Sequence, residues 1–127
     1  MASPATPPRG IVLFAHGSRD PLWCAPIEAV AAQIRACAPE VLVSCAYLEL
    51  TAPDLPAAAA GLIARGAAAI TVVPLFLGVG RHAREDLPQL IAELRRLHPQ
   101  VQVTLQPAIG EDPRLTALMA QIALAPP

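Results

Sequence analysis

The chain has 127 residues, of which 54% are hydrophobic and 15% are charged. This composition is typical of one folded domain with a single core and excludes a disordered chain. The formal net charge of -1 leaves no broad basic surface, which excludes a nucleic-acid duplex as the main partner. No apolar run is long and uninterrupted enough to span a bilayer, so no membrane partner is expected.

The N-terminal segment MASPATPPR is rich in proline and lacks the apolar stretch of a signal peptide. We therefore predict a flexible tail over residues 1–9 and one domain over residues 10–125. The three cysteines, Cys24, Cys37 and Cys45, are far apart and form no C-x-x-C pair. We interpret them as reduced, buried thiols of a cytoplasmic protein rather than as metal ligands.

The first half of the chain alternates between strand and helix patterns. Residues 10–15 form a short, continuous apolar run that predicts a strand buried on both faces. Apolar residues then recur at helical spacing over residues 22–38, until Pro39 ends the helix. Residues 41–47 predict a second strand. A second helix is expected from about Pro53 to Arg65, with Asp54 in its first turn and Gly66 after its end.

The second half repeats this alternation. Residues 69–73 predict a third strand, with Pro74 marking the end of ladder pairing. Helical spacing follows over residues 83–97, and because a proline is tolerated only near the first turn, Pro88 places the expected start near Asp86. Residues 101–105 predict a fourth strand and residues 107–112 a loop. A last helix is expected over residues 113–124, with Asp112 as its N-cap.

Four strands alternating with four helices predict an α/β fold with a parallel sheet covered by helices. Right-handed crossovers leave the flavodoxin-like strand order 2-1-3-4 as the simplest arrangement. In that order the chain changes direction between the first and third strands. Ligands of such folds bind outside the carboxyl ends of the strands at this point.

Two of the three histidines converge on this predicted crevice. His16 directly follows the first strand, and His82 lies in the loop after the third. Glu49 follows the second strand at the same edge. Imidazole binds divalent cobalt, nickel, iron or zinc, and it accepts a proton near neutral pH. We therefore read these three residues as the candidate catalytic group, with the two histidines as metal ligands. His98, at a helix end, is expected to be structural or solvated.

Polar side chains surround the candidate group. Arginines near helix starts suit a ligand with several carboxylates or phosphates. The candidate substrate-binding residues are Ser18, Arg19, Arg81 and Arg84.

Other kinds of site fit the pattern less well. Ser18 has no G-x-S-x-G elbow, and no four ligands have structural-zinc spacing. Residues 78–83, GVGRHA, match the dinucleotide fingerprint G-x-G-x-x-[GA]. The strand that follows them ends without the acidic residue that would hold a ribose, which weighs against this interpretation. We expect Gly78 and Gly80 instead to let the chain leave the third strand and bring His82 beside His16.

Three stretches together carry a resemblance to a known family: AHGSRDP at residues 15–21, AYLELTAPDL at 46–55 and VVPLFLGVGRHAREDLP at 72–88. In order and separation they resemble the small, single-domain sirohydrochlorin chelatases, the short CbiX type of cobaltochelatase among the class II chelatases. HGSR alone is moderately specific, whereas its combination with PLFL-x-x-G-x-H-x-x-x-D-[LI]-P is highly specific. The segment PLWCAPIEAV is less polar than is usual in the family, which bears on the helix start and the cleft wall.

The resemblance implies ATP-independent insertion of a divalent metal into sirohydrochlorin, a tetrapyrrole with eight carboxylates. His16 and His82 match the metal-site histidines of the family, and Glu49 matches its acid. The metal is a substrate and no permanent cofactor is implied. Co²⁺ is expected, and Fe²⁺ and Ni²⁺ also suit the ligands. The resemblance further implies a homodimer with its cleft between the subunits. Two alternatives stay open: a non-catalytic metal or tetrapyrrole carrier, and a nucleotide-binding oxidoreductase.

Overall fold

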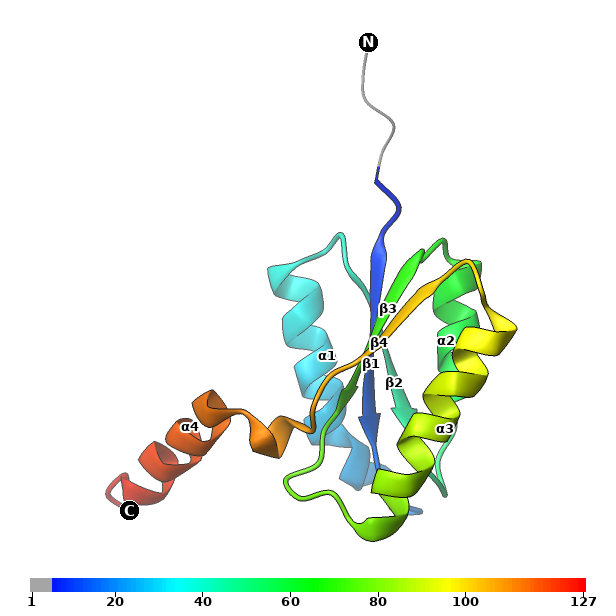
Figure 1. The fold of residues 1–127 in the computed structure, drawn as a ribbon. Helices are drawn as coiled ribbons and strands as arrows, with labels where there is room; N and C mark the ends of the chain where they lie inside the picture. The colour runs from blue at the N-terminus through cyan, green and yellow to red at the C-terminus, as the bar shows by residue number, and fades with distance from the viewer. Residues whose placement is uncertain (1–5) are drawn as a thin grey trace.

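The computed structural model describes residues 6–127 as a parallel sheet with helices on both of its faces (Figure 1). The strand order is β2-β1-β3-β4, which confirms the predicted order 2-1-3-4. The four strands are β1 (Arg9–Ala15), β2 (Leu42–Tyr47), β3 (Ala69–Pro74) and β4 (Gln102–Leu105). Arg9, which was assigned to the tail, is therefore the first residue of β1, and residues 1–5 of the predicted tail lie outside the described range.

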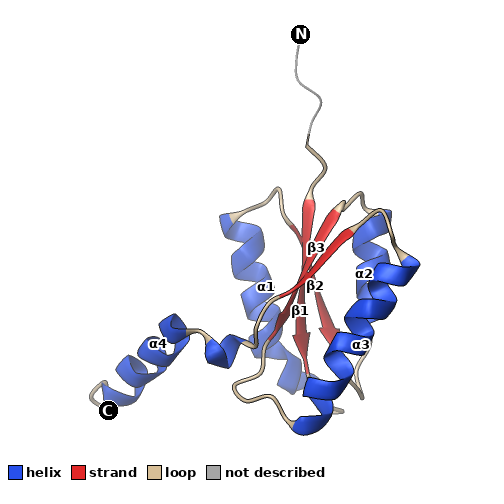
Figure 2. Ribbon diagram, in the orientation of Figure 1, coloured by secondary structure: helices blue, strands red, loops and turns tan. Residues whose placement is uncertain are grey.

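The helices divide between the two faces of the sheet. α1 lies on one face, and α2 and α3 lie on the other (Figure 2). α4 follows β4 and points away from the sheet. The bounds are α1 (Ala25–Cys37), α2 (Leu55–Ala64), α3 (Arg81–Leu97) and α4 (Pro113–Leu124), with short 3-10 turns η1 (Pro21–Cys24) and η2 (Ile109–Glu111). No helix within residues 6–127 is long and apolar enough to cross a membrane.

Two helix starts and one predicted loop differ from the sequence predictions. The first helix is split, because Asp20 accepts a hydrogen bond from the Leu22 amide and caps η1, and α1 begins only at Ala25. Asp54 is the N-cap of α2 and not part of its first turn, since its carboxylate accepts a hydrogen bond from the Ala57 amide at 2.9 Å. The predicted 107–112 loop contains η2, while Asp112 caps α4 as expected.

The expected start of α3 near Asp86 is wrong, because α3 begins at Arg81 and contains Pro88 inside it. Proline lacks the amide that would bond the carbonyl of Arg84, one turn earlier. The free energy gained by burying the apolar stripe of α3 against the sheet exceeds the cost of this missing hydrogen bond. The buried stripe consists of Ala83, Leu87, Ile91 and Leu94. As a consequence, His82 is the second residue of a helix and not a loop residue.

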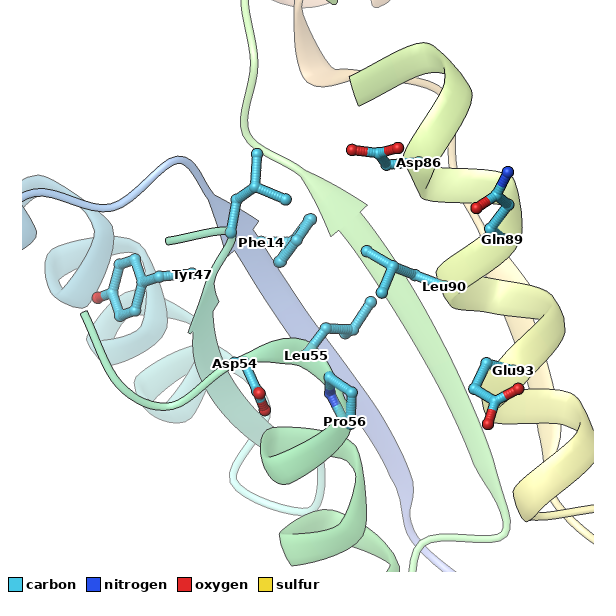
Figure 3. Close-up of a pocket in the computed structure, with 10 residues that line it drawn as sticks. Phe14, Tyr47, Asp54, Leu55, Pro56, Asp86, Gln89, Leu90 and Glu93 are labelled. Carbon is cyan, nitrogen blue, oxygen red and sulfur yellow. The ribbon is translucent and has the colours of Figure 1, made fainter. Parts of the chain in front are cut away.

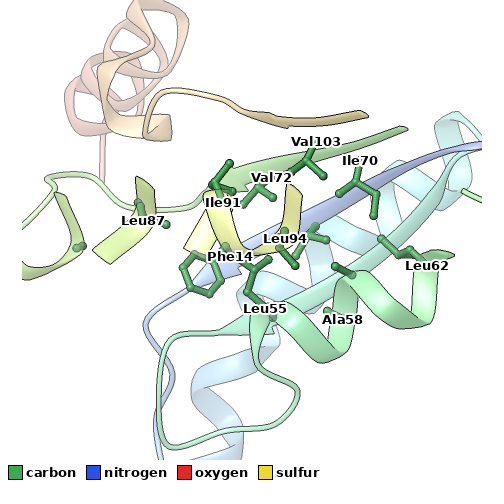
Figure 4. Close-up of a cluster of buried hydrophobic side chains, with 14 of the residues drawn as sticks. Phe14, Leu55, Ala58, Leu62, Ile70, Val72, Leu87, Ile91, Leu94 and Val103 are labelled. Atoms are coloured by element: carbon green, nitrogen blue, oxygen red, sulfur yellow. The ribbon is translucent and has the colours of Figure 1, made fainter. Parts of the chain in front are cut away.

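Two apolar cores lie on opposite faces of the sheet. The larger core fills the space between the sheet and helices α2 and α3 (Figure 4). Phe14, Val72, Leu55 and Leu94 are central to it, each at most 1% exposed. The smaller core lies under α1 and centres on Leu13, Ala31, Val43, Cys45 and Tyr47. Burial on both faces explains why the strands read as continuous apolar runs.

The carboxyl ends of three strands finish level with one another. Phe14 in β1 pairs with Ala46 in β2 and with Pro74 in β3. Just beyond the strands, the amide of Leu75 donates to the carbonyl of Phe14 at 2.7 Å. Segments that follow the three strands therefore emerge at one edge of the sheet, where the sequence predicted the site.

Candidate active site

His16 is the first residue after β1, and its side chain is exposed at the carboxyl edge of the sheet. Its ring lies against the ring of Phe76, with 4.4 Å between centroids and 34° between planes. Phe76 is buried, 2% exposed, and comes from the PLFL segment after β3. A buried aromatic wall on one side limits the orientations of the imidazole and leaves its other side open to a ligand.

The loops that carry His16 and Glu49 are joined by backbone hydrogen bonds. The Leu48 amide donates to the carbonyl of Ala15 at 2.8 Å, and the Glu49 amide donates to the carbonyl of His16 at 3.0 Å. The ladder between β1 and β2 thus continues past the strand ends. It places the two candidate residues on adjacent loops, and both side chains are exposed.

The side chain of Thr51 links the same two loops by hydrogen bonds. Its hydroxyl donates to the carbonyl of Ser18 at 2.5 Å and accepts from the amide of Ser18 at 3.1 Å. The hydroxyl of Ser18 itself accepts from the amide of Asp20 at 3.0 Å. Ser18 therefore shapes its loop, and its backbone is the part held by Thr51.

Gly17 allows this close approach of the loops. Its φ is 102°, in the left-handed region that side chains disfavour. A Cβ atom built there would lie 1.8 Å from the carbonyl oxygen of Glu49. By contrast, Gly78 and Gly80 have no left-handed φ, and a Cβ on either would meet open space. The expectation that these two glycines supply special backbone freedom is therefore not supported, and Gly80 is simply the N-cap of α3.

His82 and two of the candidate arginines share the first turn of α3. His82 is exposed there, as are Arg81 and Arg84. Arg81 donates to Glu85 at 3.4 Å, in an exposed ion pair. Arg84 lines a hollow of about 210 Å³ between α3 and the end of β4, together with Val79 and Leu105. The sequence prediction did not separate these two environments.

The candidate group does not form a closed metal site. Within residues 6–127, no cluster of three or more histidine, cysteine or acidic side chains could hold a metal ion. His16, His82 and Glu49 lie on three different segments, namely the ends of β1 and β2 and the start of α3.

A cavity of about 510 Å³ lies between the ends of β1 and β2 and the helices α2 and α3 (Figure 3). None of the predicted site residues lines it. Its polar lining is mostly acidic, from Asp54, Asp86 and Glu93, whereas Phe14 and Leu90 supply apolar surface. Arg96 lowers the pKa of the Glu93 carboxyl, which keeps that group charged. Such a lining repels carboxylates, so a polycarboxylate ligand does not suit this cavity.

Cys45 is poorly suited to metal binding because its thiol stays protonated. Burial, with a contribution from Glu28, raises the pKa of the Cys45 thiol to about 11. Because the thiolate is the metal-binding form, a neutral thiol is a poor ligand. All three cysteines are free, and Cys45 is buried as predicted. Cys24 is half-buried and Cys37 is exposed, so the prediction that all three are buried is wrong for these two.

A profile of the CbiX family matches residues 10–124. The chain belongs to the CbiX family. This confirms the resemblance that the three sequence stretches carry. The family match spans every strand and helix of the fold apart from Arg9 at the start of β1.

Proteins similar to this CbiX chain include a sirohydrochlorin cobaltochelatase from Saccharolobus solfataricus. It is 29% identical over 120 residues, which cover 88% of this chain and 91% of the relative. A sirohydrochlorin cobaltochelatase from Sulfolobus acidocaldarius is also 29% identical, over 90% of this chain and 89% of the relative.

Solved structures agree with this grouping. A CbiX protein from Marinobacter aquaeolei VT8 superposes with a TM-score of 0.79 at 36% identity, covering 91% of this chain and 94% of that one. The sirohydrochlorin chelatase SirB from Bacillus subtilis subspecies spizizenii, in complex with cobalt, gives a TM-score of 0.75 at 26% identity. The match covers 91% of this chain and 50% of SirB, so this CbiX chain corresponds to half of that protein.

Sequence reasoning missed the residues that hold the site in shape. Nothing in the sequence pattern singles out Thr51, yet its hydroxyl bonds the backbone of Ser18 across 33 positions of sequence. The apolar run that contains Phe76 gives no sign of a role at the site, yet the Phe76 ring packs against His16. Of these supporting residues, Gly17 alone is indicated by the sequence, because a glycine directly follows the candidate ligand His16.

Proposed function

We propose that this chain inserts a divalent metal ion into sirohydrochlorin, without ATP, and that the metal is a substrate. The observation that carries the proposal is the position of His16, exposed at the carboxyl end of β1 and backed by Phe76, in a chain of the CbiX family. The sirohydrochlorin cobaltochelatases that match about nine-tenths of the chain support the same reaction. Co²⁺ is the preferred metal of the proposal, with Fe²⁺ and Ni²⁺ as further substrates.

The chemistry requires one metal ion to enter the ring and two pyrrole N–H protons to leave. His16 and His82 bind the ion through neutral imidazole nitrogens at one face of the macrocycle. Glu49, on the loop bonded to His16, accepts protons directly or through water. Because the ion has few protein ligands, the four ring nitrogens replace them without breaking a closed site.

The substrate carboxylates bind the exposed cations at the edge of the sheet. Arg19 follows His16 in its loop, and Arg81 and Arg84 lie in the first turn of α3. Guanidinium groups suit carboxylates because they donate two parallel hydrogen bonds. The backbone of Ser18 shapes this side of the cleft. The acidic cavity beside Phe14 stays outside the substrate path, because its charge opposes that of the macrocycle.

One four-stranded unit provides one wall for a wide, flat ring. The second wall comes from a second copy in a homodimer, with the cleft between the subunits. The match to half of SirB agrees with this arrangement, since two units of this size make up the length of that chain.

Replacing either histidine tests the proposal. His16→Ala and His82→Ala should each lower the rate of sirohydrochlorin metallation, followed by absorbance under anaerobic conditions, by about a hundredfold or more. His98→Ala, at the end of α3, is the matched control and should retain the wild-type rate. Circular dichroism establishes that each variant is folded. If both folded site variants insert metal as fast as wild type, the assignment of the histidines fails.

A further inference from the structure

The chain contains one sequence pattern twice, each time where a helix leads into a strand. Residues 34–43 are IRACAPEVLV and residues 94–103 are LRRLHPQVQV, and both fit [IL]-R-x-x-x-P-x-V-x-V. The first copy joins α1 to β2, and the second joins α3 to β4. β2 and β4 are the two outer strands of the sheet, whereas α2 leads into the inner strand β3 without this pattern. The pattern therefore coincides with the edges of the sheet.

The two copies of the pattern also fold alike. Ala38 and His98, which precede the prolines, have φ/ψ of -143°/73° and -129°/67°. A following proline disfavours helical backbone, so both helices end here. The amide of Val41 donates to the carbonyl of Ala38, and the amide of Val101 donates to the carbonyl of His98, each at 3.0 Å. The two strands therefore begin at the same distance from the arginine of the pattern.

Backbone hydrogen bonds show which groups of the outer strands face away from the sheet. In a strand, the backbone groups of successive residues face opposite sides. The amide of Leu48 donates to Ala15 of β1, and the amide of Gln102 donates to Ala68, directly before β3. Residues one position away from these two, and every second residue from there, face outward. The outward-facing residues are Val43, Cys45 and Tyr47 in β2 and Val103 and Leu105 in β4.

Arg35 and Arg95 each donate to an outward-facing carbonyl eight residues later in the chain. Arg95 donates through Nε and Nη2 to the carbonyl of Val103, at 3.1 and 2.8 Å. Arg35 donates through Nη2 to the carbonyl of Val43, at 3.3 Å. We call Arg35 and Arg95 the edge arginines. Because β4 has only four residues, the double bond from Arg95 occupies the carbonyl at its centre.

A general preference of cations for helix ends does not explain these contacts. Arg96 lies in the same last turn of α3 as Arg95, but it pairs with Glu93 on its own helix. Within residues 6–127, neither edge arginine forms an ion pair with a carboxylate. Their guanidinium groups are spent on the strand edges instead.

A further contact closes the edge of β2. The amide of Tyr47 donates to the carbonyl of Pro53 at 2.9 Å, so the loop before α2 covers the end of this strand. Free N–H and C=O groups on an outer strand are a template for pairing with another chain. Both edges of this sheet thus have part of that template occupied by groups of the same chain.

We propose that the edge arginines keep the outer strands from pairing with the outer strands of a second copy of this chain. A strand of another copy would need the carbonyls of Val43 and Val103 as acceptors, and the guanidinium groups hold both. The pairing surface is therefore present in the fold and kept closed. The inference does not depend on the proposed reaction.

The first test removes the guanidinium group and keeps an apolar stem. Arg95→Met should form thioflavin-positive assemblies about tenfold faster than wild type or more, the factor that corresponds to losing a hydrogen bond from a charged donor. Arg35→Met tests the β2 edge in the same way. Arg96→Met is the matched control, with the same change of charge in the same helical turn, and should behave as wild type. An edge variant that assembles no faster than this control overturns the inference for its edge.

The second test separates an open edge from a loss of stability. Gly17→Ala destabilises the protein through its left-handed φ of 102° and leaves both edges intact. It should assemble as slowly as wild type, with urea unfolding used to compare its stability with that of Arg95→Met. Assembly of Gly17→Ala as fast as that of Arg95→Met would trace the effect to unfolding and overturn the inference.

The third test blocks the opened edge by other means. Adding Gln102→Lys to Arg95→Met places a charge at an exposed position of β4, which should return the assembly rate to that of wild type. Gln33→Lys, at an exposed position of α1, adds the same charge away from β4 and should leave the rate high. Equal suppression by both lysines would show an effect of net charge and overturn the inference. None of these measurements uses metal or tetrapyrrole, so their failure leaves the proposed reaction standing.

Discussion

Gly17 shows how one residue without a side chain controls the shape of the candidate site. It lies between His16 and Ser18, and its left-handed φ of 102° lets the loop after β1 pass against the loop of Glu49. Replacing it changes the backbone of a candidate metal ligand and the position of a candidate acid together.

Gly17→Ala should lower the free energy of unfolding by more than the 1–2 kcal/mol that roughly attaches to a left-handed backbone, since the new Cβ also meets the Glu49 carbonyl. Metal insertion should fall with it. Gly78→Ala is the control, because open space surrounds that position, and it should change stability little. Urea unfolding measures both variants, and equal midpoints would contradict this account of the loop.

At the residue scale, the sequence was sufficient to predict the position of a side chain where that position follows from the strand order. His16 and Glu49 follow neighbouring strands, so their adjacency could be predicted. Thr51 and Phe76 could not, because their contacts depend on how two loops approach in space. Arg84 was predicted by proximity in sequence alone, and its place beside β4 reflects the direction of α3.

At the scale of elements, α3 illustrates the competition between a local rule and packing. Pro88 predicted a late helix start, but the stripe from Ala83 to Leu94 buries four apolar side chains against the sheet. Burying each such side chain contributes on the order of 1.5–3 kcal/mol, except that alanine contributes less. The sum exceeds the roughly 3 kcal/mol cost of an internal proline. The helix therefore starts at Arg81 and includes His82.

Pro88→Ala should stabilise the protein by about 2 kcal/mol, because it restores a donor to the carbonyl of Arg84 and removes the ring clash. Pro88 is exposed, so the change leaves no cavity. Gln89→Ala, at the next exposed position, is the control and should have a small effect. Thermal unfolding compares the two, and a Pro88→Ala variant no more stable than wild type would show that α3 already relieves the strain by bending.

At the scale of the whole molecule, right-handed crossovers and apolar strands were enough to predict the order 2-1-3-4. The position of α4 could not be predicted in the same way. Its pattern indicates a helix with an apolar face, but periodicity carries no information about which surface covers that face.

The central claim is that this chain turns over as a chelatase. The most direct measurement supplies Co²⁺ and a large excess of sirohydrochlorin over enzyme, without ATP, and follows absorbance to completion. The account predicts that the full excess is metallated. Conversion that stops at one equivalent per site, with the product retained on the protein, would contradict it and identify the chain as a carrier.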